Sequence, residues 1–474
     1  MVKSNMWPTI VPLPVDLEAR KRMLLSIFSS PITLEVLETI PIDKEILQRD
    51  LINRLSSHSN RTVIKSLKIL KKYGLIREKD VVVKSGMRKV KVKSYMLTDM
   101  GKWFHLMFVD PKSIEPSTLR KMVEEFMELT INKISSLYNI NEVPYLSEMF
   151  LEKVIKSYMN YNAFDPQVYV LGSVAIDHYF KPIGNAESLL GLNYEYIGSF
   201  PGGSGANVAS NLSRLGLNVG FYGKIASDVH GLELFLDLVK NNVNLKHVVI
   251  DKNSKTVEVL VMLSRDGESK MTYMIHKDSA LSPLNVDGEV LEQIGGSEAV
   301  YIGEVFHEVS SQVIRFCKKV GDILIVYRPS IYALKYMTSE YLSLLRYSPI
   351  LIINSRKVDI LESKGISIPS TLFNLGVENI IITMGSKGAT LFSKRYGKGI
   401  RFTAPRVSPI DTVGAGDMFS ATLIYALLNG MELIEAIRYA VAAASLTTQY
   451  IGARSRTPLV DEIEEKLREV KVMP

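Results

Sequence analysis

Short apolar segments alternate with helix-length segments from Val168 to the end of the chain, and this alternation constrains the fold more than any other feature. The segments read VYVLGS, VGFYGKI, AVYIGEVF, ILIVY, PILIIN and NIIITMG. Strands separated by helices form right-handed βαβ units, so we expect a mainly parallel sheet covered by helices on both faces. Ligands bind such sheets at the carboxyl ends of the strands.

A glycine-rich turn opens a long apolar helix in DTVGAGDMFSATLIYALLNG, from Asp411 to Gly430. Backbone N–H groups at the positive end of a helix have no intrahelical partner, and they form a natural cradle for phosphate. Asp417 lies at the mouth of this helix. A carboxylate there would orient a substrate hydroxyl and accept its proton during phosphoryl transfer.

A second glycine-rich segment, FPGGSGANVASNLSRLG, begins at Phe200. Its glycines, Gly202 and Gly203, let the backbone approach a small polar ligand, and Asn207 can both donate and accept hydrogen bonds. Just upstream, GSVAIDHYF contains Asp177, a candidate for binding substrate hydroxyl groups.

These segments resemble the signatures of the ribokinase, or PfkB, family of carbohydrate and nucleoside kinases. The D-T-x-G-A-G-D string is the most specific of them, GKIASDVHG and IIITMGSKGATLF are similar to further family segments, and the resemblance covers about 290 of the 474 residues. It implies a ribokinase-like α/β fold with a small β lid between Asp177 and Gly202. It also implies phosphorylation of a sugar or nucleoside with ATP and Mg²⁺.

The resemblance also implies a role for each matching residue, although it assigns none as a metal ligand. Asp417 is the expected catalytic base. The other expected sites are an anion hole (Gly414, Ala415, Gly416), a substrate site (Asp177, Gly202, Gly203, Asn207) and a nucleotide site (Gly385, Ser386, Gly388).

Two departures from the family pattern bear on activity. Where the family has Asn-x-x-Glu for magnesium and phosphate placement, this chain keeps Asn354 but has Lys357 in place of the glutamate. A cation there would repel the metal. The family's Asp-x-Asn-x-Arg stretch is present as LIVYR and keeps only its arginine, Arg328.

The positive charge is concentrated in one segment near the N-terminus. Residues 51–110 hold 14 Lys or Arg against 4 Asp or Glu, whereas the whole chain carries a net charge of +7. Such concentration favours a polyanionic partner for this segment.

The same region has apolar residues at helical spacing over residues 19–28, 32–40 and 42–55, and a further helix over SSHSNRTVIKSLKILKKYGLI with Ser57 or Ser59 as its N-cap. Two β-rich strands follow around a turn at Ser85 and Gly86. This order resembles that of archaeal and bacterial winged helix-turn-helix regulators, and it implies binding of double-stranded DNA.

The candidate DNA-binding residues lie on the polar face of the last helix and in the hairpin, where they suit base and phosphate contacts. They are Ser59, Asn60, Arg61, Lys65, Lys68, Arg88, Lys89 and Lys91. The alternative is a protein-docking module whose lysines are only a solvated face.

We therefore expect a multi-domain chain: a winged helix (α+β) over residues 1–110, a helical connector over residues 111–165 and a ribokinase-like domain over residues 166–474. In the connector, Leu119, Met122, Phe126 and Leu129 recur at helical spacing. They suit either the seam of a homodimer or packing on a neighbouring domain. No apolar run is long enough to cross a membrane and the start lacks a secretory signal, so we expect a cytoplasmic protein.

Three functions fit these features. The first is a transcriptional regulator with an active sugar or nucleoside kinase domain. The second is a regulator whose kinase fold only senses a ligand, and the third is a metabolic kinase whose N-terminal module mediates assembly. Asp417 and its glycine turn favour retained chemistry, whereas Lys357 favours sensing.

Overall fold

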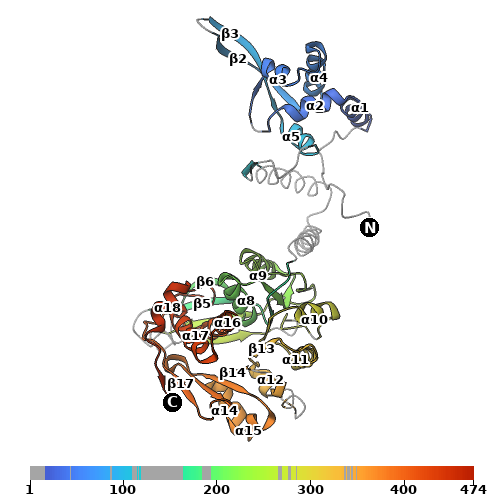
Figure 1. Ribbon diagram of the computed structural model, residues 1–474. Coiled ribbons are helices and arrows are strands. Elements are labelled where there is room, and N and C mark those ends of the chain that lie inside the picture. The colour runs from blue at the N-terminus through green and yellow to red at the C-terminus, as the bar shows by residue number, and fades with distance from the viewer. Residues whose placement is uncertain are drawn as a thin grey trace. The chain divides into compact units, whose positions relative to one another are not determined.

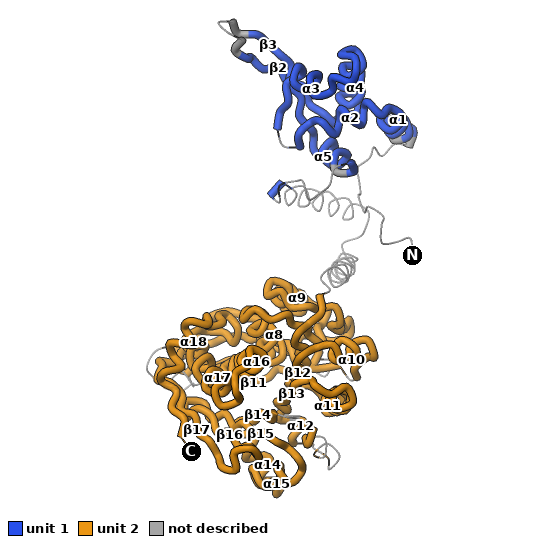
Figure 2. Tube along the Cα trace, viewed as in Figure 1, with its two compact units in different colours: residues 1–143 blue, residues 144–474 orange. Residues whose placement is uncertain are grey.

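The computed structural model describes residues 17–42, 44–85, 88–108, 115, 117–118, 164–183, 194–264, 269–275, 279–283, 285–335, 338, 342, 345–347 and 350–473. The chain forms two compact units, residues 1–143 and residues 144–474 (Figure 2). The predicted dimer seam, from Leu119 to Leu129, lies outside the described residues. No helix in the described ranges is long and apolar enough to span a membrane.

The N-terminal unit packs helices against a three-stranded antiparallel sheet with the strand order β1-β3-β2 (Figure 1). Its buried core includes Ile27, Leu37, Leu51, Leu67 and Phe104. The elements are α1 (Leu17–Phe28), α2 (Pro31–Thr39), β1 (Ile46–Leu47), α3 (Gln48–Arg54), α4 (Asn60–Lys72), β2 (Ile76–Ser85), β3 (Arg88–Leu97) and α5 (Asp99–Leu106).

The predicted helix over residues 42–55 is shorter than expected. Ile46 and Leu47 form β1 instead, because they pair with Tyr95 and Ser94 of β3, and the helix α3 begins at Gln48. The predicted start of the next helix is confirmed at Ser59, whose hydroxyl accepts a hydrogen bond from the backbone N–H of Thr62 at 3.2 Å.

The C-terminal unit is built on a nine-stranded sheet with the order β18-β17-β16-β15-β14-β13-β12-β4-β7. The pairs from β7 to β15 are parallel, and those from β15 to β18 are antiparallel. The strands are β4 (Val168–Leu171), β7 (Val219–Tyr222), β12 (Ala299–Ile302), β13 (Leu324–Tyr327), β14 (Ile350–Asn354), β15 (Asn379–Thr383), β16 (Ala389–Ser393), β17 (Ile400–Phe402) and β18 (Val472–Met473).

Alternate residues of the central strands enter two separate cores, because successive side chains of a strand point to opposite faces. On β4, Val168 and Val170 belong to one core, and Tyr169 and Leu171 belong to the other. The helices α8 (Ser204–Arg214), α9 (Val229–Lys240), α16 (Ala415–Leu428), α17 (Leu433–Thr447) and α18 (Val460–Leu467) contribute to the first core. The helices α10 (Gly288–Gly295), α11 (His307–Val320), α12 (Ile331–Lys335), α14 (Ser355–Glu362) and α15 (Ser370–Leu375) contribute to the second. The predicted parallel sheet with helices on both faces is confirmed.

A second, four-stranded sheet lies in the same unit, with the order β11-β10-β5-β6. Its strands are β5 (Ala175–Pro182), β6 (Tyr194–Gly202), β10 (Glu258–Leu263) and β11 (Ser269–Met274), while β8 (Lys224–Ala226) and β9 (Val249–Asp251) form a separate parallel pair. The sequence predicted only the half of this sheet between Asp177 and Gly202. The β10–β11 hairpin comes from a distant segment, so its pairing with β5 could not be read from local pattern.

Candidate functional site

The helix α16 begins at Ala415, directly after Gly414, which lies in the left-handed region with φ of +83°. A Cβ atom on Gly414 would lie 2.4 Å from the carbonyl oxygen of Ala453, so only glycine fits this turn. The turn leaves the first N–H groups of α16, from Ala415 and Gly416, at the positive end of the helix. These are the residues predicted to form an anion hole.

Asp417 lies in the first turn of α16 and is almost fully buried. Its Oδ1 accepts a hydrogen bond from the hydroxyl of Ser204 at 2.8 Å, and its Oδ2 accepts one from the Nδ2 of Asn207 at 2.7 Å. Both donors lie on α8, directly after the glycines Gly202 and Gly203. The two glycine-rich segments of the sequence therefore meet at one carboxylate.

Arg328 completes this cluster from the end of β13. Its guanidinium forms an ion pair with Asp417 and donates a hydrogen bond to the Ser204 hydroxyl at 3.2 Å. Burial acts to lower the pKa of Arg328, but the charge of Asp417 and nearby Glu304 raises it. A Cβ atom on Gly416 would lie 2.6 Å from the guanidinium, so Arg328 lies against the glycine turn.

Asp177 is on β5 and is buried beside the backbone of Gly202, where an added Cβ would lie 2.2 Å from its Oδ2. Burial raises the pKa of Asp177 to about 7, helped by the charges of Asp417 and Asp411 and opposed by that of Arg454. A carboxyl group with this pKa exchanges a proton near neutral pH.

Arg454 was not among the predicted site residues, although it is buried in the middle of the cluster. It donates hydrogen bonds to the Gly202 carbonyl at 3.0 Å, to the Oδ1 of Asn207 at 3.1 Å and to the Oδ2 of Asp237 at 2.8 Å. Asn207 is thus held in one orientation, with its amide nitrogen toward Asp417.

The residues predicted to hold a nucleotide form a tight turn between β15 and β16. Gly385 and Gly388 have φ values of +56° and +87°, and the N–H of Gly388 donates to the carbonyl of Gly385 at 2.9 Å. Gly385 and Ser386 are exposed, whereas Gly388 is buried. The turn follows β15, Arg328 follows β13, and Asn354 is the last residue of β14. Because β13, β14 and β15 are consecutive in the sheet, the turn and both residues lie at its carboxyl edge.

Lys357 occupies the first turn of α14 and is buried. The Oδ1 of Asn354 accepts a hydrogen bond from the Lys357 backbone N–H at 3.0 Å, which makes Asn354 a helix cap. Burial, helped by the charge of Arg328 and opposed by those of Glu304 and Asp417, lowers the pKa of Lys357 to about 8. The lysine therefore belongs to the electrostatic environment of Asp417.

Ser204 and Arg328 were not among the predicted site residues. Ser204 lies inside the predicted segment FPGGSGAN, and Arg328 was noted only as the remaining arginine of the segment LIVYR. Nothing local in the sequence marks Arg454 as a partner of Asn207. The two residues are far apart in the chain, and only the packing of α8 against the segment after α17 brings them together.

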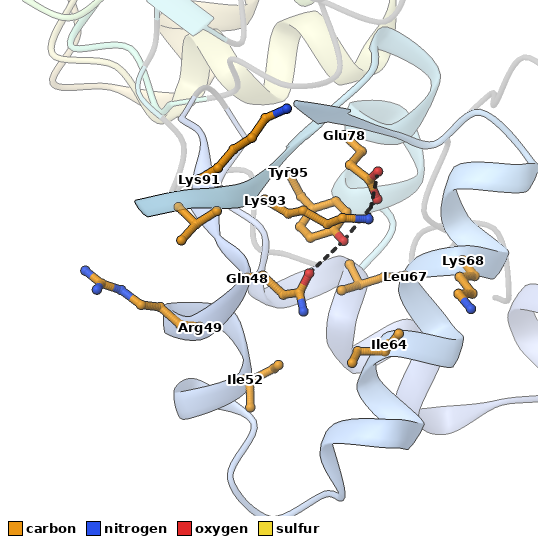
Figure 3. Close-up of a pocket in the computed structure, with 11 residues that line it drawn as sticks. Gln48, Arg49, Ile52, Ile64, Leu67, Lys68, Glu78, Lys91, Lys93 and Tyr95 are labelled. Carbon is orange, nitrogen blue, oxygen red and sulfur yellow. Dashed lines mark hydrogen bonds and ion pairs between the residues drawn. The ribbon is translucent and has the colours of Figure 1, made fainter. Parts of the chain in front are cut away.

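In the N-terminal unit, a surface pocket lies between α3, α4 and the β2–β3 hairpin (Figure 3). At its centre the Tyr95 hydroxyl contacts Gln48 Oε1 at 3.1 Å and Glu78 Oε2 at 3.2 Å, and Lys93 pairs with Glu78 at 3.1 Å. The cations Arg49, Lys68, Lys91 and Lys93 also line the pocket.

Five of the predicted DNA-binding residues, Ser59, Asn60, Arg61, Lys65 and Lys68, are exposed on or next to α4. Arg61, Lys65 and Lys68 line a second pocket with Ile64, and none of the three forms an ion pair with another residue that the structure describes. Lys91 pairs with Asp80 at 3.0 Å, while the side chains of Arg88 and Lys89 lie outside the described part of the chain.

Comparison with known proteins gives consistent matches for the C-terminal unit. The model of the pfkB family carbohydrate kinases matches residues 165–459. The chain is 28% identical over 310 residues to ribokinase of Haemophilus influenzae, an alignment that covers 63% of this chain and 97% of that protein. It is 29% identical over 291 residues to 5-dehydro-2-deoxygluconokinase of Halalkalibacterium halodurans, covering 56% of this chain and 84% of that one.

Among solved structures, the Arabidopsis thaliana ribokinase complexed with ribose and ATP superposes with a TM-score of 0.53 and 25% identity, covering 64% of this chain and 99% of that one. These matches concern the C-terminal unit, which is about the length of the whole relatives.

Proposed function

Because this chain belongs to the pfkB family of carbohydrate kinases, we propose that residues 166–474 transfer the γ-phosphoryl group of ATP to a hydroxyl group of a sugar or nucleoside, with Mg²⁺. The observation that carries the proposal is the Asp417 carboxylate, buried at the N-terminus of α16 and held by Ser204 and Asn207. The 25% identical Arabidopsis ribokinase was solved with ribose and ATP, which supports the same ligand classes here.

In this proposal Asp417 accepts the proton of the attacking hydroxyl, while the hydrogen bonds from Ser204 and Asn207 fix the direction of the carboxylate. We assign the N–H groups of Gly414, Ala415 and Gly416 to the charge that builds on the phosphoryl oxygens. Arg328 adds a positive charge against the same turn. Asp177, Gly202, Gly203 and Asn207 bind substrate, and Gly385, Ser386 and Gly388 lie along the nucleotide.

The phosphate side of the site fits ATP better than the metal side fits Mg²⁺. On the phosphate side, the left-handed Gly414 precedes the first turn of α16, whose N–H groups lie at the positive end of that helix. On the metal side, the buried Lys357 replaces a carboxylate, and Asn354 Oδ1 is used as a helix cap. Mg²⁺ is commonly held by substrate phosphates, so we assign it no protein ligand.

The direct test is phosphoryl transfer by the purified full chain with ATP and Mg²⁺ across a panel of pentoses, hexoses, hexose phosphates and nucleosides. We expect a phosphorylated product from one compound class. Thermal stabilisation by a panel member without any product would instead support the second candidate, a ligand sensor, which is favoured by the cation at position 357.

For residues 1–110 we propose a winged helix that binds double-stranded DNA, so that the chain acts as a homodimeric transcriptional regulator. Support comes from the basic, exposed face of α4 and from the cation-lined pocket between α4 and the β2–β3 hairpin. The alternative is a protein-docking role. Fluorescence anisotropy of labelled duplex DNA over a range of salt concentrations separates the two, since phosphate contacts make affinity fall steeply with salt.

A further inference from the structure

The strand β5 has ionisable side chains on both of its faces. Asp177, on one face, belongs to the site described above, and its neighbours Ala175 and Tyr179 pack in a small apolar core with Val259 and Val261 of β10. The adjacent residue His178 therefore points to the opposite face of the four-stranded sheet.

Two polar partners of His178 share that face. Ser199 is directly opposite His178 in the pairing of β5 with β6. Leu260 is opposite His178 in the pairing with β10, and Glu258 lies two residues before Leu260, so Glu258 points to the same side. Accordingly, the Nε2 of His178 lies 3.0 Å from the Oε2 of Glu258, and its Nδ1 lies 2.7 Å from the Ser199 hydroxyl.

The helix α9 brings a second histidine to this place, and it contacts both β5 and β6 (Figure 1). Its N-cap, Asp228, accepts hydrogen bonds from the Gly231 N–H at 2.7 Å and from the Thr256 N–H at 2.8 Å. Because Thr256 lies two residues before Glu258, this cap fixes the start of α9, with His230, next to the start of β10.

The three side chains converge. One ligand atom from each of His178, His230 and Glu258 lies within 4.8 Å of those from the other two. The two imidazole rings meet edge to face with centroids 5.9 Å apart. The Nδ1 of His230 is buried and has no hydrogen-bond partner among the described residues, and its ion-pair contact with the Glu233 carboxylate is 3.7 Å long.

We propose that His178, His230 and Glu258 bind one divalent transition-metal ion of the Zn²⁺ class, which ties the strands β5 and β10 to α9. Two imidazoles and one carboxylate are a ligand set that Zn²⁺ takes, with a fourth position left for water. Zn²⁺ at its ordinary bond lengths of about 2.0–2.2 Å holds tetrahedral donor atoms about 3.4 Å apart, close to the 3.0 Å that already separates Nε2 of His178 from Oε2 of Glu258.

The surroundings suit a metal rather than an isolated hydrogen bond. Ligating histidines usually donate their other ring N–H to an oxygen, and Ser199 is placed to accept it from Nδ1 of His178. The Ser199 hydroxyl is in turn 2.6 Å from that of Tyr196. The side chains of His230 and Glu258 are each 38% exposed, so an ion can enter from solvent.

The test uses the full chain, free of any affinity tag, stripped with a chelator and then titrated with Co²⁺ as a spectroscopic probe of the Zn²⁺ site. We expect one Co²⁺ per chain, with the intense visible bands of a four-coordinate ion, displaced by Zn²⁺. Zn²⁺ should also raise the melting temperature, and the chelator should reverse the rise.

Single replacements His178→Asn, His230→Asn and Glu258→Gln should each weaken Co²⁺ binding at least about 100-fold, and Ser199→Ala about 10- to 100-fold. The matched control is His307→Asn, a replacement at the start of α11 outside the cluster. Each apo variant is first checked for a melting transition, and Glu258→Gln provides the test if a histidine variant fails to fold. The proposal would be overturned if the parent chain failed to bind one Co²⁺ per chain. It would also be overturned if the three ligand variants bound Co²⁺ as tightly as the parent chain.

Discussion

The Arg328 guanidinium and the Asp417 carboxylate form a hydrogen-bonded ion pair, and both also contact the hydroxyl of Ser204. The pair joins the end of β13 to the first turn of α16, and its two residues are 89 positions apart in the sequence. The arginine that survives from the Asp-x-Asn-x-Arg stretch therefore lies on the residue that we propose as the catalytic base.

Arg328→Met should lower the free energy of unfolding by about 3–5 kcal/mol, because it leaves a buried carboxylate without its cation. The double variant with Asp417→Asn should lose less than the sum of the single losses, by about 1–3 kcal/mol. Denaturant unfolding of the four chains measures this coupling.

Arg395→Met is the control for that cycle. Its partner Glu432 is 3.5 Å away and both side chains are largely exposed, so the change should stay below about 0.5 kcal/mol. Strictly additive effects of the Arg328 and Asp417 replacements would rule out the coupling.

The raised pKa of Asp177 makes stability depend on pH. The pKa is about 7 in the folded chain against the ordinary value of 3.8, so folding favours the protonated form. The stability that this group contributes is complete below about pH 4 and is lost as the pH rises to 7. Asp177→Asn should therefore raise the melting temperature relative to the parent chain at pH 8 but not at pH 4.

A shift of this size corresponds to an upper bound of about 4 kcal/mol. Melting curves recorded from pH 4 to pH 8 for both chains provide the measurement. Two curves that stay parallel over the whole range would show that Asp177 is not protonated in the folded chain near neutral pH.

Position 357 should control how tightly Mg²⁺ binds in the presence of ATP. Lys357→Glu removes a positive charge and restores the residue of the Asn-x-x-Glu pattern. The Mg²⁺ concentration that gives half-saturation should therefore fall by about tenfold or more. Lys357→Met, which removes only the charge, should give a smaller decrease. Calorimetric titration of Mg²⁺ into the ATP-bound chains measures the three values, and three equal values would contradict the assigned effect of the lysine.

Charge reversal on α4 tests the proposed DNA interface. Arg61→Glu together with Lys65→Glu should weaken duplex binding at least about tenfold and reduce the slope of log affinity against log salt by about 2. Lys394→Glu with Lys398→Glu changes the net charge equally on exposed residues of the C-terminal unit and should have little effect. If the α4 variant bound DNA as tightly as the parent chain, the DNA interface would lie elsewhere.

The mainly parallel sheet and the glycine turn before α16 could be predicted, because βαβ alternation and glycine turns are local signals. Ser59 was likewise found as a cap. The meeting of the two glycine-rich segments at Asp417 could not, since its hydrogen bonds to Ser204 and Asn207 join residues far apart in the chain. The β10–β11 half of the second sheet could not be predicted, since no local pattern ties Leu260 to His178. Arg454 and the His178–His230–Glu258 cluster were missed for the same reason: their partners are far away in the chain and meet only after packing.

The most direct test of the central claim compares the parent chain with Asp417→Asn, measuring phosphoryl transfer and sugar binding in parallel. The amide keeps the shape of the side chain but cannot accept the proton, so turnover should fall by about 10²- to 10⁴-fold while the ligand still stabilises the chain against heat. Equal turnover in the two chains would contradict the role of Asp417 as the base of a kinase.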